Sequence, residues 1–308
     1  MTAVQSSVCW CCWDPLSEGE QHHAACLRRL FGKPNVPAIE VDPASYHLFG
    51  AEMAGHITLS GVQRKLSLGW HHRSLRVTAE RSSFILKPGE SAFPALPENE
   101  CLTMALARDF GLKTAHSGLV ELAGGTRALL VRRFDRVAHG HRVHMEDFCQ
   151  LAEQDPAQKY EGSAELCMRI IREFATDPGV QCALLFRRLL FAWWVGDGDL
   201  HLKNLSVLRP ERGRVALAPV YDAVNTTILL PNEQLALPLH GKRSRLDRLD
   251  WLAFGDYAKI SPRLVIEELA RPQVLLETAQ AKVSRSLLPE SLRKAYMALL
   301  VERANSLD

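Results

Sequence analysis

The chain has 308 residues, of which 47% are hydrophobic and 23% charged, and its formal net charge at pH 7 is +2. This length and apolar content are sufficient for one large domain, or for two lobes with a substantial core. A charge so close to balance gives no reason to expect direct binding of nucleic acid, because even the basic cluster 242–248 contains an acidic residue.

The sequence also bears on the cellular compartment. The most apolar window, 183–196, is short and is interrupted by Arg187 and Arg188, so we expect no membrane contact. The N-terminus lacks a basic region followed by an apolar one, and the eight cysteines are irregularly placed, which is typical of reduced thiols. These features predict a cytoplasmic protein.

The first half of the chain is predicted to be rich in β-structure. Residues 1–50 are turn-rich and contain four of the eight cysteines, and residues 56–90 show strand-like alternation with tight polar breaks. A helix is expected over 97–112, because a proline and acidic residues stand in its first turn and a glycine follows its last apolar residue. Two further strands are expected at 117–122 and 126–134.

From about residue 145 the pattern predicts mainly helices. A buried helix is expected over 178–196, which is apolar almost all round, and another over 289–304. One hairpin interrupts them, with strands at 205–208 and 215–222. We therefore predict an α+β protein with two unlike lobes, between which a ligand could bind.

The polar stretch 196-GDGDLHLKN-204 follows the buried helix and suggests a site. A calcium loop that starts at Asp197 would need an oxygen ligand at its fifth position, glycine at its sixth and glutamate at its twelfth. These positions hold His201, Leu202 and Leu208, so the calcium interpretation fails.

Phosphoryl transfer explains the same stretch better. Asp199 and Asn204 have the D-x4-N spacing of a kinase catalytic loop, in which the aspartate takes the proton of the acceptor hydroxyl and the asparagine binds magnesium. Asp222, at the end of the predicted hairpin, could provide the second magnesium ligand. Taken singly, these residues would also suit a polar loop and a turn or helix cap.

Upstream residues could complete a nucleotide site. Lys87 follows the apolar run 84–86 and can reach the phosphates, with Glu100 as the preferred ion-pair partner and Glu98 as the alternative. The hydroxyl-rich turn 58–65 could cover the phosphates with backbone N–H groups. The order of these elements, rather than any one of them, predicts a kinase that uses ATP and Mg²⁺.

Six segments together resemble the HipA-type serine/threonine kinases of bacterial toxin–antitoxin systems. They are 60-SGVQRKLSL-68, 84-FILKP-88, 133-RFDR-136, 145-MEDFCQL-151, 199-DLHLKN-204 and 221-YD-222. The resemblance covers roughly residues 45–260. Longer HipA proteins carry a small domain ahead of this region, so the chain looks more similar to HipT, the short kinase of three-component HipB–HipS–HipT systems. Its first segment, 9–32, is also HipT-like.

The resemblance implies a two-lobed, protein-kinase-like fold. Residues 1–131 would form the N-lobe, with the Cys-rich segment and the loop over ATP, and residues 132–308 the helical C-lobe, with the catalytic loop and the metal-binding hairpin. Asp199 would be the catalytic base, and Asn204 and Asp222 the metal ligands. The residues expected at ATP are Lys87, Glu100, Ser60, Gly61, Val62, Gln63, the hinge residues Arg133 and Phe134, and His201 and Lys203.

Autophosphorylation is implied in the loop over ATP, at Thr58 and Ser60. Three positions depart from the family pattern. Thr58 replaces a serine, Asp197 replaces an asparagine, and Arg132 replaces the acidic residue of the hinge. Because a phosphate adds about −1.5 to −2 charge, modification of this loop should inhibit the kinase.

The resemblance implies a protein target of the aminoacyl-tRNA synthetase class, tryptophanyl-tRNA synthetase for the HipT type, and growth arrest as the outcome. It implies two partners, a HipS-like small protein and a HipB-like DNA-binding antitoxin. The alternative is a small-molecule kinase of the aminoglycoside or choline phosphotransferase type, which has a similar loop to 198–204. The SGVQ, RFDR and MEDFCQL segments argue against it.

Four residues near the N-terminus have a spacing that could bind zinc. Cys9, Cys12, His23 and Cys26 form the pattern C-x2-C-x10-H-x2-C, with Cys11 and His22 as spare candidates. Kinase chemistry needs no zinc, so the sequence favours reduced cysteines and surface histidines.

Overall fold

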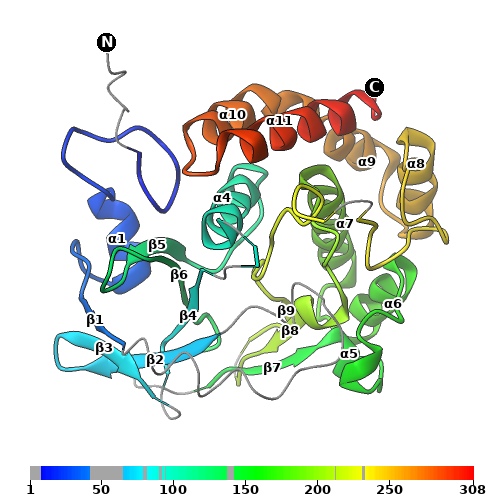
Figure 1. Ribbon diagram of the computed structural model, residues 1–308. Helices are drawn as coiled ribbons and strands as arrows, with labels where there is room; N and C mark the ends of the chain where they lie inside the picture. Colours follow the sequence, from blue (N-terminus) through cyan, green and yellow to red (C-terminus); the bar gives the residue numbers. More distant parts are fainter. Residues whose placement is uncertain are drawn as a thin grey trace.

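A computed structural model of the chain describes residues 8–41, 65–78, 82–89, 92–93, 95–136, 142–211, 213–230 and 233–308. Within these ranges, most strands belong to the first half of the chain and most helices to the second (Figure 1). The molecule is therefore of the predicted α+β class, with a sheet-rich part and a helical part.

The larger sheet places Lys87 on an interior strand. Its six strands have the order β1-β3-β2-β4-β6-β5, and every pairing is antiparallel except that of β1 with β3. Lys87 lies on β4, opposite Leu129 of β6. The strands are β1 (Ala38–Glu40), β2 (Leu66–His71), β3 (Ser74–Val77), β4 (Phe84–Pro88), β5 (Ser117–Glu121) and β6 (Arg127–Arg132).

Helix α4 (Leu96–Asp109) joins this sheet to the helical part. It starts with the expected proline in its first turn, and all its side chains from Leu96 to Ala107 are buried. It packs on β5 and β6 on one side and on α10 (Arg271–Arg285) on the other (Figure 1). The hydroxyls of Thr103 and Tyr296 are 2.9 Å apart, which adds a polar contact to α11 (Glu290–Asn305). One hydrophobic core therefore runs from the sheet through α4 into the helices.

The remaining elements form the helical part and a small sheet of order β7-β8-β9. Helix α7 (Pro178–Val195), which precedes the predicted catalytic loop 196–204, is mostly buried, as its sequence predicts. None of the helices in the described ranges has both the length and the apolar composition of a membrane span. The other elements are α5 (Phe148–Leu151), α6 (Ala164–Phe174), α8 (Arg248–Tyr257), α9 (Pro262–Leu269), β7 (His144–Asp147), β8 (Ser206–Arg209) and β9 (Ala216–Leu217), with 3-10 turns η2 (Pro156–Gln158) and η3 (Leu202–Asn204).

The strand predicted over 215–222 is much shorter in the structure, where β9 covers only Ala216–Leu217. Pro219 has no N–H to donate to the ladder. Beyond it, the chain pairs elsewhere: the Val220 N–H donates to the Lys113 carbonyl at 2.7 Å, and the Val220 carbonyl accepts from Ala115 at 2.8 Å. This change of partner carries the following residues toward α4.

Two further elements differ from the sequence prediction. The region from about residue 145, expected to be helical, starts with strand β7, which pairs with β8 and leads directly into α5. Residues 1–50, expected to be turn-rich, contain helix α1 (Ala24–Phe31), whose buried residues Cys26, Leu27, Leu30 and Phe31 recur at helical spacing. Both elements are short, so their periodicity is weak in the sequence.

Candidate active site

Four charged side chains meet where the sheet, α4 and the segment after β9 come together. The Lys87 Nζ lies 2.5 Å from the Glu100 Oε1 and 2.5 Å from the Asp222 Oδ1. The Lys65 Nζ contacts the other oxygen of Asp222 at 2.9 Å. We call Lys65, Lys87, Glu100 and Asp222 the lysine–carboxylate cluster. It brings together, from distant parts of the sequence, three residues predicted to act together.

Opposite charges keep the centre of this cluster ionised. Burial alone would lower the pKa of Lys87, but Asp222 and Glu100 outweigh it and hold the pKa above its ordinary value. Burial alone would raise the pKa of Asp222, but Lys65 and Lys87 outweigh it and hold that pKa well below the ordinary range. The site therefore offers a fixed ammonium group and a fixed carboxylate side by side.

The structure distinguishes between the two candidate partners of Lys87. Glu98 pairs instead with Arg127 of β6, with 2.5 Å between its Oε1 and the arginine Nε. Glu98 and Glu100 are two residues apart on α4 and therefore point in different directions. Glu100 is the residue that contacts Lys87.

Backbone and amide contacts determine where Asp222 lies. The Asn99 side chain donates from its Nδ2 to the Asn225 carbonyl at 2.9 Å, and its Oδ1 accepts from the Asn225 N–H at 3.1 Å. Asp222 itself has a positive φ of 58°, a conformation that is uncommon outside glycine but tolerated by aspartate. The segment that carries Asp222 is thus fastened to α4, the helix that carries Glu100.

The catalytic loop is held from both ends. Gly196 caps the C-terminal end of helix α7, where its φ of +79° suits glycine. The Gly196 carbonyl accepts a hydrogen bond from the Thr226 N–H at 2.9 Å. The Asn204 Nδ2 donates to the Asp199 carbonyl at 3.2 Å, and the buried Arg188 donates to the Asn204 carbonyl at 2.6 Å. This bonding holds both the backbone and the side-chain amide of Asn204.

The Asp199 carboxylate is mostly buried and has a partner that its sequence context did not suggest. The Tyr160 hydroxyl donates to the Asp199 Oδ1 at 2.7 Å. Burial raises the pKa of Asp199, and the bond from Tyr160 offsets part of that rise. Lys159 is close enough to be influenced by Asp199, although burial lowers its own pKa. Sequence analysis missed Lys159 and Tyr160, because no motif relates this turn to a loop forty residues away.

His201 and Lys203, which were expected at ATP, lie on the catalytic loop. The His201 ring packs edge-on against Tyr160, with 5.1 Å between centroids, and among the described residues neither ring nitrogen has a hydrogen-bond partner. Burial lowers the pKa of His201 to about 4, so the ring is neutral at physiological pH. The Lys203 carbonyl accepts from the Tyr221 hydroxyl at 2.9 Å.

Asp197 is a third aspartate near the candidate site, in addition to Asp199 and Asp222. It is 1% exposed, and its Oδ1 has no hydrogen-bond partner in the described part of the chain. Burial, together with the nearby charges of Asp199 and Asp222, raises its pKa well above the ordinary value. Protonation of Asp197 is therefore favoured, which distinguishes it chemically from the ionised Asp222.

The two hinge residues make different contacts. The Arg133 N–H donates to the Ser83 carbonyl at 2.9 Å, while its guanidinium pairs with Asp135 at 2.7 Å. The centroid of the Phe134 ring lies 5.5 Å from that of the Tyr221 ring. Tyr221 comes directly before Asp222 in the sequence. Phe134 is thus close in space to the metal-ligand candidate, whereas the Arg133 side chain is directed to Asp135.

The remaining predicted site residues, Thr58, Ser60, Gly61, Val62 and Gln63, lie outside the described residues. Lys65 is the first described residue after them and contacts Asp222. Sequence analysis quoted Lys65 within a motif but gave it no role.

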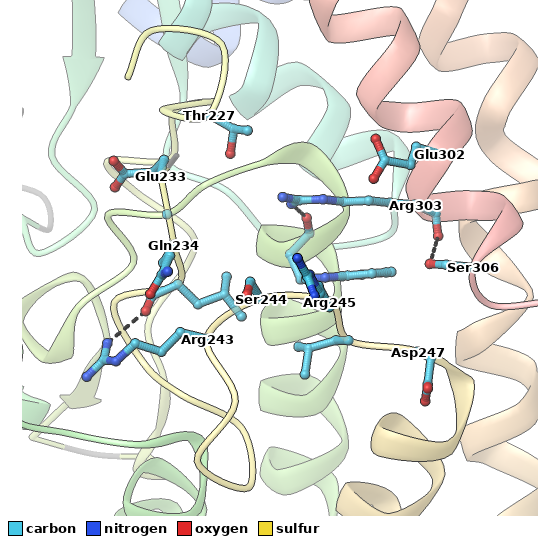
Figure 2. A pocket seen from close by; sticks show the side chains of 14 residues that line it. Thr227, Glu233, Gln234, Arg243, Ser244, Arg245, Asp247, Glu302, Arg303 and Ser306 are labelled. Carbon is cyan, nitrogen blue, oxygen red and sulfur yellow. Dashed lines mark hydrogen bonds between the residues drawn. The ribbon is translucent and has the colours of Figure 1, made fainter. Parts of the chain in front are cut away.

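A cavity of about 460 Å³ adjoins the catalytic loop at Gly198, the neighbour of Asp199 (Figure 2). None of the four residues of the lysine–carboxylate cluster lines this cavity, so the cavity is separate from that cluster. The Arg303 guanidinium enters it and bonds to the Trp193 carbonyl. The other lining residues are Thr227, Glu233, Gln234, Leu235, Arg243, Ser244, Arg245, Leu246, Asp247, Glu302 and Ser306.

A lysine on an interior strand, its glutamate partner on the adjoining helix and a loop with the D-x4-N spacing are together typical of a protein-kinase-like fold. Within that class, the sequence profile of the HipA-like C-terminal domain matches residues 57–283. The chain therefore belongs to the HipA-like C-terminal domain family.

Individual relatives agree with this assignment. The serine/threonine-protein kinase toxin HipA of Shewanella oneidensis is 26% identical over 85% of this chain and 65% of its own length. Y4mE of Sinorhizobium fredii, which carries a provisional kinase name, is 32% identical over 75% of the chain and 57% of its own length. Y4dM of the same organism, which also carries a provisional kinase name, is matched over 63% of its own length. The chain therefore spans about three fifths of the length of Y4dM and Y4mE.

Solved structures show the same fold. A chain from the complex of HipA, HipB and operator DNA of Shewanella oneidensis MR-1 superposes with a TM-score of 0.72 at 21% identity, over 95% of this chain and 80% of that one. The Helicobacter pylori proinflammatory kinase CtkA superposes with a TM-score of 0.54 at 14% identity, over 78% of this chain and 90% of that one. The predicted two-lobed, HipA-like fold is thereby confirmed.

Proposed function

We propose that the protein is an ATP-dependent serine/threonine protein kinase. The observation that carries this proposal is the buried contact of Lys87 with both Glu100 and Asp222. In protein kinases the corresponding lysine–glutamate pair and metal-binding aspartate must both be in place for phosphoryl transfer. We also propose a lobe boundary at residues 131 and 132, next to the hinge residues Arg133 and Phe134.

Asp199 is the proposed base. Its carboxylate would accept the proton of the target hydroxyl, and the Tyr160 hydroxyl, 2.7 Å from the Oδ1, would hold the carboxylate in place. Because burial raises the pKa of Asp199, the residue is a stronger base than an exposed aspartate. The protonated carboxyl favoured at Asp197 makes that residue a poor base.

The oxygens of Asp222 and Asn204 fit the preference of Mg²⁺ for carboxylate and amide ligands. A bound Mg²⁺ would neutralise charge on the ATP phosphates. Both oxygens of Asp222 contact lysine ammonium groups, so metal binding would require Lys65 and Lys87 to exchange this carboxylate for phosphate oxygens. His201 and Lys203, on the catalytic loop, complete the proposed ATP site.

The proposed biological role is that of a toxin of the HipT type. The similarity to HipA, and to a chain solved with HipB and operator DNA, supports a DNA-binding antitoxin of the HipB kind as partner. A HipS-like small protein and a target of the aminoacyl-tRNA synthetase class, with tryptophanyl-tRNA synthetase first, complete the proposal. We place the reaction in the cytoplasm.

Autophosphorylation at Thr58 and Ser60 is a further part of the proposal. Ser60 is five residues before Lys65, which contacts Asp222. Thr58 is seven residues before Lys65. Chains of five and seven residues span at most about 18 Å and about 25 Å, so both hydroxyls can approach the phosphate site. Phosphate on either hydroxyl would repel the ATP phosphates.

Incubation with labelled ATP tests the proposed activity. The full chain and its Asp199→Asn variant are each added to bacterial lysate with Mg²⁺. We expect label on a discrete protein of synthetase size and on the chain itself, and neither with the variant. Label on a small metabolite alone would identify a small-molecule kinase and refute the proposal, as would undiminished labelling by the variant.

A further inference from the structure

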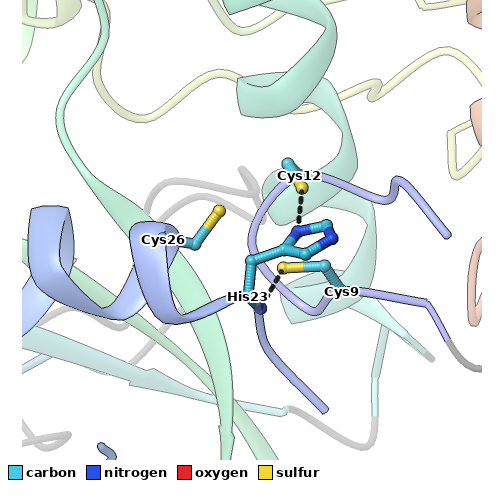
Figure 3. Close-up of side chains that lie close together, drawn as sticks. All are labelled: Cys9, Cys12, His23 and Cys26. Atoms are coloured by element: carbon cyan, nitrogen blue, oxygen red, sulfur yellow. Dashed lines mark hydrogen bonds between the residues drawn. The ribbon is translucent and has the colours of Figure 1, made fainter. Parts of the chain in front are cut away.

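A second site lies away from the kinase residues, in the N-terminal segment. Cys9, Cys12, His23 and Cys26 converge so that their potential ligand atoms all lie within 4.8 Å of one another (Figure 3). We call these four residues the Cys–His cluster. A tetrahedral zinc ion with bonds of about 2.0–2.3 Å holds its ligand atoms roughly 3.5–3.8 Å apart. We propose that the Cys–His cluster binds one structural Zn²⁺ through three thiolates and one imidazole.

The bonding of His23 suits metal coordination. Its Nδ1 faces the Cys12 Sγ at 3.3 Å, and its Nε2 lies 3.1 Å from the Pro15 carbonyl. A histidine that coordinates zinc through one nitrogen commonly donates its other N–H to such an oxygen, which fixes the tautomer and the ring orientation. The ring is therefore already held with Nδ1 toward the three sulfurs.

Two of the three sulfurs lie next to backbone groups that favour a metal-bound thiolate. The His23 N–H points to the Cys9 Sγ at 3.3 Å, so a backbone donor supports negative charge there. Cys26 lies in the first turn of α1, where the positive end of the helix favours a thiolate. His23 precedes that turn without a side-chain capping bond, and its ring is directed to Cys12 instead.

Cys11 provides a contrast within the same turn. Its sulfur lies over Gly118 of β5, so closely that a Cβ on Gly118 would collide with it. Cys11 is not one of the four residues whose ligand atoms converge. The structure thus brings four potential ligand atoms together and leaves Cys11 packed against β5, a distinction that spacing alone left open. The proposal departs from the sequence-based expectation of reduced, metal-free cysteines.

The metal would stabilise a turn that touches three parts of the fold. The Trp10 carbonyl accepts from the Leu119 N–H of β5 at 2.9 Å and from the Cys101 thiol of α4 at 3.2 Å. The Cys12 carbonyl accepts from the Lys282 Nζ of α10 at 2.8 Å. The turn is thus a junction of the sheet edge, α4 and α10, and zinc would fix its shape.

Metal analysis of the purified full chain tests the proposal. The chain is produced as Asp199→Asn, so that toxicity does not limit expression, and is purified without chelator. We expect one zinc per chain, retained in Cys11→Ala and lost in Cys12→Ser and His23→Gln. Cys12 and His23 are only partly buried, so these two variants should remain folded, as circular dichroism can show.

Exchange with Co²⁺ provides a readout that depends only on the ligands. Three thiolates and one imidazole should give a thiolate-to-cobalt charge-transfer band and the intense visible bands of a tetrahedral ion, and Cys12→Ser should weaken the charge-transfer band. Substoichiometric zinc in the parent chain, a disulfide among the four residues, or equal zinc loss in Cys11→Ala would overturn the assignment. None of these readouts requires kinase activity, so the zinc proposal and the kinase proposal can fail separately.

Discussion

Replacement of Lys87 by methionine should separate the structural from the catalytic contribution of the lysine–carboxylate cluster. The substitution removes the contact at 2.5 Å between the Lys87 ammonium and Glu100, whose side chain is 2% exposed, while Asp222 keeps Lys65. At this distance the gross attraction is about 7 kcal/mol for an effective dielectric constant of about 20, before desolvation is subtracted. Removal of one partner of a buried pair typically costs about 3–5 kcal/mol, and we expect Lys87→Met to fall in that range.

Urea unfolding at several pH values provides the assay. Burial already raises the pKa of Glu100 in the parent, and Lys87 opposes that rise. In Lys87→Met the pKa should therefore rise further, so that the folded state binds a proton over a pH range in which the unfolded state has released it. The loss of stability should therefore be greatest at neutral pH and shrink as pH falls through the raised pKa. The double variant Lys87→Met/Glu100→Gln carries no buried charge at position 100 and should recover most of the stability at neutral pH.

Phosphoryl transfer should be absent from both variants, because the lysine proposed to contact the ATP phosphates is missing in each. Recovery of stability without recovery of activity would assign the two effects to different causes. If Lys87→Met unfolds at the same urea concentration as the parent, or if the double variant gains nothing over the single one, the buried pair does not contribute as argued and the reasoning is refuted.

Two other substitutions test the surroundings of the catalytic loop. Tyr160→Phe removes the bond that lowers the pKa of Asp199, so the acidic limb of the pH–rate profile should move to higher pH; an unchanged limb would contradict a base held by Tyr160. His201→Gln removes a ring whose pKa falls from 6.5 to about 4 on folding, so the parent should lose up to about 3 kcal/mol of stability as pH falls from 6.5 to 4, and the variant should not. Parallel stability–pH curves for parent and variant would show that the ring is not held neutral.

The sequence predicted the parts of the site that belong to local motifs. Asp199 and Asn204 share one loop, and the run before Lys87 has a strand pattern, so their types and spacing could be read directly. Glu100 rather than Glu98 is the ion-pair partner of Lys87, as we preferred from the sequence. The sequence alone could not decide between two acids in one helical turn, because the position of β6, whose Arg127 pairs with Glu98, is set by the sheet.

Contacts between distant segments could not be predicted. Tyr160 meets Asp199 across thirty-nine positions, and nothing in its own turn marks it as a partner. Strand β9 was overestimated, because its apolar alternation continues past the proline at which the chain changes partner. For the Cys–His cluster, the spacing was visible in the sequence, but convergence of the four ligand atoms required the fold.

The burial of helix α4 has a consequence for inhibitors. The helix that carries Glu100 is covered by the sheet on one side and by α10 on the other, and Thr103 bonds to Tyr296 of α11. A compound that worked by displacing this helix outward would have to open the core of the molecule, at roughly 1.5–3 kcal/mol for each large apolar side chain exposed. Medicinal chemistry on this scaffold should therefore aim at Lys65 and Asp222, which are partly accessible to solvent and belong to the proposed nucleotide site, rather than at a displaced helix.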